Sequence, residues 1–285
     1  MRYRLYTPPG LRPSEQLPLV VMLHGCTQDA QALASVSKMN RLAQRERFLV
    51  LYPEQDRLSN LQNCWNWYDT RAGRAQREAD LVAATVGHIC QTHRGDHRRV
   101  ALVGLSAGAS LASLLAVRQP ERFSAVVMHS GVAPGLATST ATALAAMRGR
   151  RSAVPLKPLA TGMHLPALLV IQGTADPIVA PGNASQAAQL WADREGARAG
   201  LPRELQRGKR YPATVTDYRC ADRLVATLCL VNGLGHAWSG GAPGVAYSDA
   251  KGPDASRMAW SFIQKQFSAG QLLSASQRMT RPRSR

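Results

Sequence analysis

The sequence predicts an α/β fold: a single domain over residues 1–268, with a mostly parallel sheet flanked by helices on both faces. Apolar runs alternate along the chain with segments of helical spacing. The runs are continuously apolar, which is typical of strands buried on both faces. Strands that alternate with helical segments favour a parallel sheet whose crossovers are helices.

Each element follows from its local pattern. The first segment alternates and ends at the turn Pro8-Pro9-Gly10, and the run LPLVVML that follows it is wholly apolar. Strands are predicted over 3–7, 17–23, 48–52, 100–103, 125–128, 167–171, 213–219 and 224–231, the last two as a hairpin. Helices are predicted over 39–47, 79–93 and 256–267, and in the small-residue stretch that follows Gly108.

Two segments depart from this alternation. Residues 134–161 fit neither a strand nor a long helix, and we expect them to form a cap or a flexible loop over the site. Residues 269–285 are basic and are expected to form a disordered tail.

The net charge of +17 raises the question of a nucleic-acid partner. Most of the 35 basic residues are arginines scattered singly, and the sequence contains neither a zinc-finger spacing nor an RNA-recognition motif. We therefore expect no specific nucleic-acid partner. The sequence has no apolar run long enough to span a bilayer, and its first residues lack the apolar core of a signal peptide.

A serine stands between two glycines where a predicted strand meets a predicted helix. The motif is Gly104-Leu105-Ser106-Ala107-Gly108. Where a strand leads directly into a helix in this way, the chain reverses so sharply that side chains next to the serine would clash, and glycines relieve the crowding. The alternative is a glycine-rich turn that happens to contain a serine. The strand before and the helix after the motif favour Ser106 as a nucleophile.

A serine nucleophile needs a base, and the base needs an orienting acid. Of seven histidines, His236 follows the last strand in a glycine-rich loop. Asp176 lies five residues beyond the strand 167–171, in a turn stopped by Pro177. The competing aspartates fall in a predicted helix, a hairpin strand and a hairpin turn, and are Asp193, Asp217 and Asp222.

The oxyanion of an ester intermediate needs fixed N–H donors. One is predicted to be the backbone amide of Ala107, directly after the nucleophile. The loop after the strand 17–23 supplies the second, and Gly25 would let the backbone approach the substrate. The amide of Cys26 is therefore the predicted second donor.

With these residues in view, the chain closely resembles the PHB-depolymerase esterase family of α/β-hydrolases. The matching stretches extend from residue 2 to about residue 267 and include LPLVVMLHGCTQ, CWNWYD, RRVALVGLSAG, GTADPIVAPGNA and GLGHAWSGG. The resemblance implies Ser106 as nucleophile, Asp176 as acid and His236 as base, and ester hydrolysis through an acyl-enzyme without metal or cofactor. It implies poly(3-hydroxybutyrate) and related short-chain polyesters or their oligomers as substrates. Feruloyl or acetylxylan esterase activity on the same triad is the alternative.

The chain departs from the family pattern in two places. Family members carry a further strand before the one matched by residues 2–6, so an N-terminal strand is expected to be missing. Depolymerases of solid polymer also carry a linker and a polymer-binding domain, which LLSASQRMTRPRSR does not resemble. Soluble oligomers or amorphous polyester are thus the expected substrates.

Aromatic residues and cysteines complete the predicted site. Substrate-binding roles are predicted for Trp65, Trp67, Trp238 and His24, against the alternative that the tryptophans only pack.

Cys26 and Cys64 follow strands that should be neighbours, and both loops emerge on the site face, so they are predicted to form a disulfide. Cys220 and Cys229 are out of register in the predicted hairpin and should not pair. The disulfide and the resemblance favour an extracellular or periplasmic protein. A cytoplasmic location is the alternative.

Overall fold

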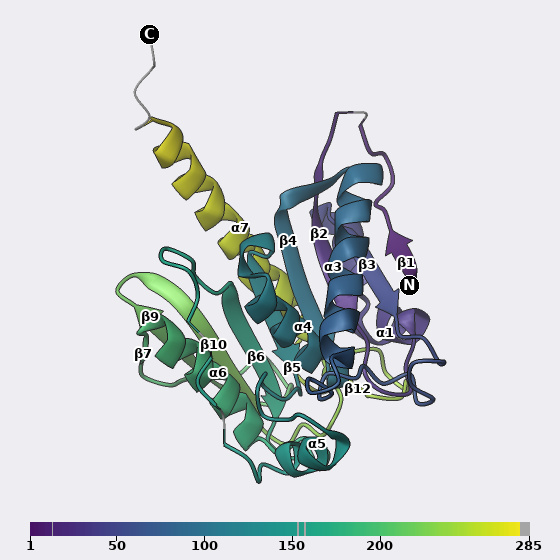
Figure 1. Cartoon of the computed structure of the whole chain (residues 1–285), viewed down its shortest axis with the longest axis vertical. Helices are drawn as coiled ribbons and strands as arrows, with labels where there is room; N and C mark the ends of the chain where they lie inside the picture. Colours follow the sequence, from purple (N-terminus) through teal and green to yellow (C-terminus); the bar gives the residue numbers. More distant parts are fainter. Residues whose placement is uncertain (13, 153, 157, 280–285) are drawn as a thin grey trace.

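The computed structural model describes residues 1–12, 14–152, 154–156 and 158–279. A 10-stranded mixed sheet runs through the molecule (Figure 1). Helices α3, α4 and α6 share the buried core on one face, and α1, α2 and α7 share the core on the other. The predicted α/β fold with a mostly parallel sheet is therefore confirmed.

The central strands appear where continuous apolar runs predict them, whereas the sequence pattern does not predict the short strands over 198–199 and 203–205. Five neighbouring pairs, from β3 to β10, are parallel, whereas the strands at the two edges are antiparallel. The order across the sheet is β1-β3-β2-β4-β5-β6-β10-β9-β7, with β8 beside β9. The strands are β1 Arg2–Tyr6, β2 Leu17–Leu23, β3 Leu49–Glu54, β4 Gly95–Leu105, β5 Ala125–His129, β6 Ala167–Gly173, β7 Arg198–Ala199, β8 Arg203–Leu205, β9 Ala213–Cys220 and β10 Arg223–Val231.

Strand β2 illustrates why the central strands lack polar alternation. Leu19, Val21 and Leu23 belong to the core on one face, whereas Val20 and Met22 belong to the core on the other. Because successive side chains point to opposite faces, a strand covered on both sides must be apolar at every position.

The helices fill the intervals between strands. They are α1 Ala30–Ser37, α2 Met39–Glu46, α3 Arg74–Thr92, α4 Ala107–Arg118, α5 Thr140–Met147, α6 Gly182–Glu195 and α7 Ala255–Met279. A short 3₁₀ turn spans Pro120–Arg122, and a small second sheet pairs β11 Trp238–Ser239 with β12 Ser248–Asp249.

The C-terminal segment differs from the prediction. Helix α7 continues through residues 269–279, which were expected to be a disordered tail, and Figure 1 shows it extending past the sheet. Gln, Leu, Ala and Met dominate there, and such residues sustain a helix across the single Gly270. The predicted tail residues 280–285 lie outside the described residues. Within the described part, no helix is long and apolar enough to cross a membrane.

Candidate active site

The structure brings Ser106, Asp176 and His236 to one edge of the sheet. Ser106 follows β4 directly, Asp176 lies in the turn after β6, and His236 lies in the loop after β10. These three strands belong to the continuous parallel part of the sheet, so their carboxyl ends share an edge. Ligands of open α/β sheets bind at that edge.

The backbone at Ser106 has the conformation that the glycine motif predicts. Its φ of 55° and ψ of −120° are strained for a residue with a side chain. A Cβ on Gly108 would lie 2.1 Å from the carbonyl oxygen of Leu23, and one on Gly104 would lie 2.3 Å from the backbone of Gly108. The two glycines therefore let β2, β4 and α4 pack closely enough to hold this turn.

His236 and Asp176 form a direct pair. Nδ1 of His236 lies 2.8 Å from Oδ2 of Asp176, and both side chains are almost completely shielded from solvent. Burial raises the pKa of Asp176, but the hydrogen bond and charge of His236, with the N–H groups of Val179 and Ile178, outweigh it and lower the pKa overall. Asp176 therefore stays ionised and fixes the imidazole ring, leaving Nε2 for proton transfer.

Backbone contacts hold the acid turn against the base loop. The N–H of Ala175 donates to the carbonyl of Leu234 at 3.0 Å, and the N–H of Thr174 donates to that of Val231 at 3.0 Å. A Cβ on Gly173 would lie 2.1 Å from the Leu234 oxygen. The glycine after β6 thus permits the approach that brings the two loops together.

The loop after β2 packs against Ser106. A Cβ on Gly25 would lie 3.5 Å from Cβ of Ser106. The N–H of Gly25 donates to Oε1 of Gln28 at 3.0 Å, which removes this amide as an oxyanion donor. Cys26 and Ala107 line one cavity together with Ser106, and Ala107 begins α4, where N–H groups lack intrahelical partners.

The predicted disulfide between Cys26 and Cys64 is present. It joins the loop after β2 to the loop after β3, whose strands are neighbours. In the part of the chain that the structure describes, Cys90, Cys220 and Cys229 form no disulfide. Cys229 lies opposite Val215 and Cys220 lies opposite Arg223, so the two cysteines are out of register, as predicted.

A cavity of about 160 Å³ opens at Ser106. One wall comes from α5, which lies within the segment 134–161. The other walls come from the loop that follows β3 and from the residues around Ser106. The apolar and aromatic lining residues are Trp67, Tyr68, Val132, Ala143, Leu144, Met147 and Val179.

Three of the four predicted substrate-binding residues do not line this cavity. Trp65 and His24 pack behind the loop of Cys26, where the indole N–H of Trp65 donates to the His24 carbonyl at 3.0 Å. Nε2 of His24 accepts a hydrogen bond from the N–H of Gln55 at 3.1 Å, so this ring nitrogen already has a partner within the protein. Trp238 is 1% exposed and donates to Oγ of Ser256 at 3.2 Å. Of the four predicted substrate-binding residues, only Trp67 lines the cavity.

A buried carboxylate that the sequence analysis missed holds the loop carrying Cys64 and Trp67. Glu78 on α3 is 6% exposed and accepts from Nε2 of Gln55 at 2.7 Å. It also accepts from the N–H of Asn66 at 2.8 Å and from its Nδ2 at 2.6 Å. The signal was present in the sequence, because Glu78 lies at helical spacing among the buried residues Ala75, Ala79 and Val82.

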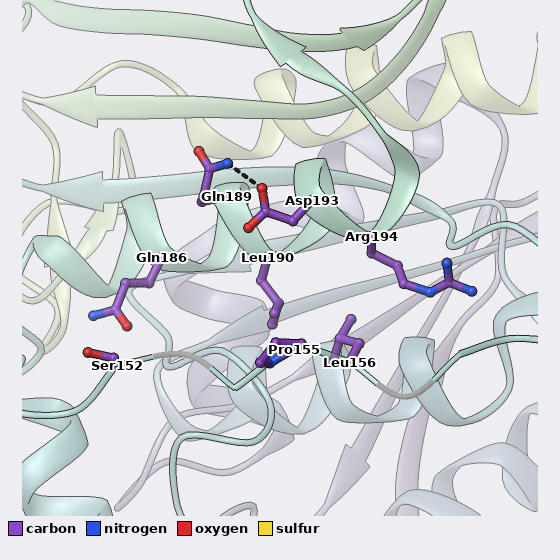
Figure 2. A pocket seen from close by; sticks show the side chains of 8 residues that line it. All are labelled: Ser152, Pro155, Leu156, Gln186, Gln189, Leu190, Asp193 and Arg194. Carbon is purple, nitrogen blue, oxygen red and sulfur yellow. Dashed lines mark hydrogen bonds between the residues drawn. The ribbon is translucent and has the colours of Figure 1, made fainter.

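A second cavity, of about 490 Å³, lies between α6 and the residues Ser152, Pro155 and Leu156. Figure 2 shows its polar lining, with Nε2 of Gln189 donating to Oδ1 of Asp193 at 2.6 Å. None of the predicted site residues contributes to it. Among the described residues, no three His, Cys, Asp or Glu side chains are grouped as metal ligands.

A family model, curated relatives and solved structures match this chain. The family model described as "Esterase PHB depolymerase" matches residues 1–201. A stretch of 188 residues, 63% of this chain, is 31% identical to poly(3-hydroxyalkanoate) depolymerase C of Paucimonas lemoignei. The chain spans 45% of the length of that relative.

Two further relatives are named as other kinds of esterase. A probable acetylxylan esterase A of Aspergillus clavatus is 26% identical over 72% of this chain and 70% of its own length. Feruloyl esterase B of Thermothelomyces thermophilus is 28% identical over 62% of this chain and 65% of its own length.

Solved structures share the fold. The acetyl xylan esterase from Aspergillus awamori superposes with a TM-score of 0.64 at 20% identity, covering 82% of this chain and 88% of that one. Because the family model matches well over half of the sequence, the chain belongs to the PHB depolymerase family of esterases.

Proposed function

We propose that the chain is a serine esterase that hydrolyses short-chain polyhydroxyalkanoate, such as poly(3-hydroxybutyrate), or its oligomers. Ser106, His236 and Asp176 form the catalytic triad. The pair of His236 with Asp176 at 2.8 Å, beside a strained serine at the same sheet edge, carries the proposal.

The reaction proceeds through an acyl-enzyme. Nε2 of His236 takes the proton of the Ser106 hydroxyl while Oγ attacks the ester carbonyl. The tetrahedral intermediate then collapses, the C–O bond to the alcohol breaks, and His236 returns the proton to the leaving oxygen. Water, activated by the same histidine, hydrolyses the acyl-enzyme and regenerates Ser106.

The backbone N–H groups of Cys26 and Ala107 hold the oxyanion. Each such donor typically lowers the barrier by about 2.7–4 kcal/mol. The disulfide from Cys26 to Cys64 and the packing of Trp65 against His24 fix the first of these donors. Donors that are already in place need no reorganisation during the reaction.

The size of the cavity favours a short acyl group. Its volume of about 160 Å³ falls below the roughly 300–1,000 Å³ of pockets for drug-sized ligands. Aliphatic side chains such as Val132, Leu144 and Met147 supply much of the wall. A hydroxybutyryl unit suits this space better than a feruloyl group does.

A feruloyl or acetylxylan esterase is the second candidate. Trp67 and Tyr68 form an edge-to-face pair with ring centroids 5.7 Å apart in the cavity wall, a surface on which an aromatic acid can also rest. Relatives with both esterase names match this chain.

We also propose that the chain acts in an oxidising compartment, extracellular or periplasmic, since disulfides persist there. In this view residues 1–268 form the catalytic domain, and α5 is part of a cap over its cavity.

The substrate is tested by comparing kcat/KM on a 3-hydroxybutyrate oligomer, methyl ferulate and acetylated xylan. The proposal expects the oligomer to be preferred. A Met147→Phe variant, which narrows the cavity, should reduce turnover of the oligomer more than that of a p-nitrophenyl acetate control. Preference for ferulate or acetylated xylan in the wild type would select the second candidate.

A further inference from the structure

His129, the last residue of β5, connects the nucleophile to the loop of the base. It is fully buried, and its Nε2 accepts a hydrogen bond from the N–H of Ser239 at 3.1 Å, across 110 positions of sequence. Because Nε2 accepts, the ring proton is on Nδ1, which lies 3.0 Å from Oγ of Ser130. Both ring nitrogens are therefore engaged.

Two more contacts link this residue to the site. The carbonyl oxygen of His129 accepts from the N–H of Ser106 at 2.8 Å. Its ring stacks on Trp238, with centroids 5.1 Å apart and an angle of 24° between the planes. Trp238 and Ser239 lie two and three residues after His236 in the chain. One side chain and its backbone thus touch both the nucleophile and the segment behind His236.

The ring is suited to this position because it stays neutral. Burial lowers the pKa of His129 to about 3, and the nearby charge of His236 acts in the same direction. A neutral neighbour does not compete with His236 for the proton taken from Ser106. A permanently charged side chain in the same place would repel the imidazolium that forms during the reaction.

We propose that His129 is a positioning residue, which sets the placement of the base loop relative to Ser106 through its acceptor at Nε2; the inference rests on the proposed esterase mechanism. The Ser239 N–H is buried and needs an acceptor. A histidine supplies one at the far end of a flat ring that also packs against Trp238. An apolar residue could fill the space but would leave this N–H without its partner.

Three variants separate these contributions. His129→Phe keeps an aromatic ring for Trp238 and removes the acceptor, whereas His129→Gln places an amide oxygen near the position of Nε2. His88→Phe makes the same chemical change on the exposed face of α3 and is the matched control. We measure kcat and KM with p-nitrophenyl butyrate, and amide hydrogen exchange across residues 236–240.

For His129→Phe we expect kcat to fall by about 10²-fold, the size of effect that a small misplacement of a catalytic group produces, with KM changed less than about twofold. Exchange of the Ser239 amide should accelerate. His129→Gln should recover most of kcat and of the protection, and His88→Phe should match the wild type in both.

Three results would overturn the inference. These are wild-type kcat in His129→Phe, an equal loss of kcat in the Phe and Gln variants, and unchanged exchange at Ser239 in His129→Phe. Failure of the proposed function is distinguishable, because ester turnover would then be absent or independent of Ser106 in the wild type. Hydrogen exchange and the tautomer of His129, read by ¹⁵N NMR in the wild type, still test the positioning contact in that event. A proton on Nε2 would contradict it even if His129→Phe failed to fold.

Discussion

Asp176 and His236 lie 60 residues apart in the sequence, yet Oδ2 of the first lies 2.8 Å from Nδ1 of the second. The contact depends on two loops that are themselves joined by backbone hydrogen bonds from Thr174 and Ala175. Three other hydrogen bonds fix the carboxylate, because the N–H groups of Ile178 and Val179 donate to Oδ1 and Nε2 of Gln172 donates to Oδ2. The acid is therefore held on both oxygens while it orients the imidazole.

Replacing this acid by its amide should remove catalysis without unfolding the protein. In Asp176→Asn the imidazole loses the acceptor that fixes its tautomer, and kcat should fall by about 10³- to 10⁴-fold. Steady-state kinetics and circular dichroism measure the two effects. Asp193→Asn, on the exposed side of α6, is the control. Equal activity of both variants would argue against Asp176 as the acid.

The glycine after the nucleophile should tolerate no side chain. A Cβ at Gly108 would lie 2.1 Å from the Leu23 oxygen, inside any permitted contact, so Gly108→Ala should destabilise the fold by at least about 3 kcal/mol. At Gly182, the first residue of α6, a Cβ meets nothing within 4 Å. Gly182→Ala should therefore change stability by less than about 1 kcal/mol. Urea unfolding measures the stability of the two variants. Similar unfolding midpoints would show that Gly108 is not packed as closely against Leu23 as the structure has it.

The disulfide should support both stability and catalysis. It closes a loop of 38 residues, which corresponds to about 4 kcal/mol in the chain-entropy model. The double variant Cys26→Ala/Cys64→Ala should lose stability on this scale, and kcat should fall by roughly 10-fold or more because the Cys26 amide is less well fixed. Cys90→Ala, which removes a free cysteine, serves as control. Undiminished kcat in the double variant would show that the loop is held by other contacts.

Stability should decline below pH 6.5 because of buried histidines. The pKa of His129 falls from 6.5 in its ordinary state to about 3 in the fold, and burial also lowers the pKa of His24. At a pH between 6.5 and about 3, the unfolded chain binds a proton at His129 that the folded protein does not bind. The stabilisation is therefore fully present above pH 6.5 and is lost as the pH falls. The slope contributed by His129 reaches about 1.4 kcal/mol per pH unit, and the lowered pKa of His24 acts in the same direction.

Urea unfolding at pH 7.5 and 5.5 measures this dependence. His129→Gln should lose less stability than the wild type over the same interval, because it removes one of the two titrating groups. An identical pH dependence of the two proteins would show that His129 is not buried in its neutral form.

Two rules that need only the local sequence predict much of the fold and of the candidate site. Continuous apolar runs predict the parallel strands, and residues that follow such strands meet at one edge, which is why Ser106, Asp176 and His236 were found together. The pairing of Cys26 with Cys64 follows from the same rule, since β2 and β3 are neighbours.

The rules do not say which way a loop side chain points. Trp65 and Trp67 follow the same strand two residues apart, but only Trp67 faces the cavity, while Trp65 lies behind the loop of His24. The interval between strand and residue is nearly the same for both. Long-range partners decide between them, and for Trp65 the partner is a backbone carbonyl 41 positions away.

Histidines at strand ends show the same limit. His24 and His236 follow strands and His129 ends one, and the three residues differ in what surrounds each ring. Nε2 of His24 and Nε2 of His129 each accept from a backbone N–H, whereas His236 is oriented by a carboxylate. Those partners come from other segments of the chain, so no local sequence pattern predicts them.

The most direct test of the central claim compares ester hydrolysis by the wild type and Ser106→Ala. With p-nitrophenyl butyrate, the wild type should release p-nitrophenol with a burst that equals the enzyme concentration, followed by steady turnover. Ser106→Ala should fold normally, show no burst and lose at least about 10⁴-fold in kcat. Equal turnover by the two proteins would contradict the assignment of Ser106 as nucleophile, and with it the proposed mechanism.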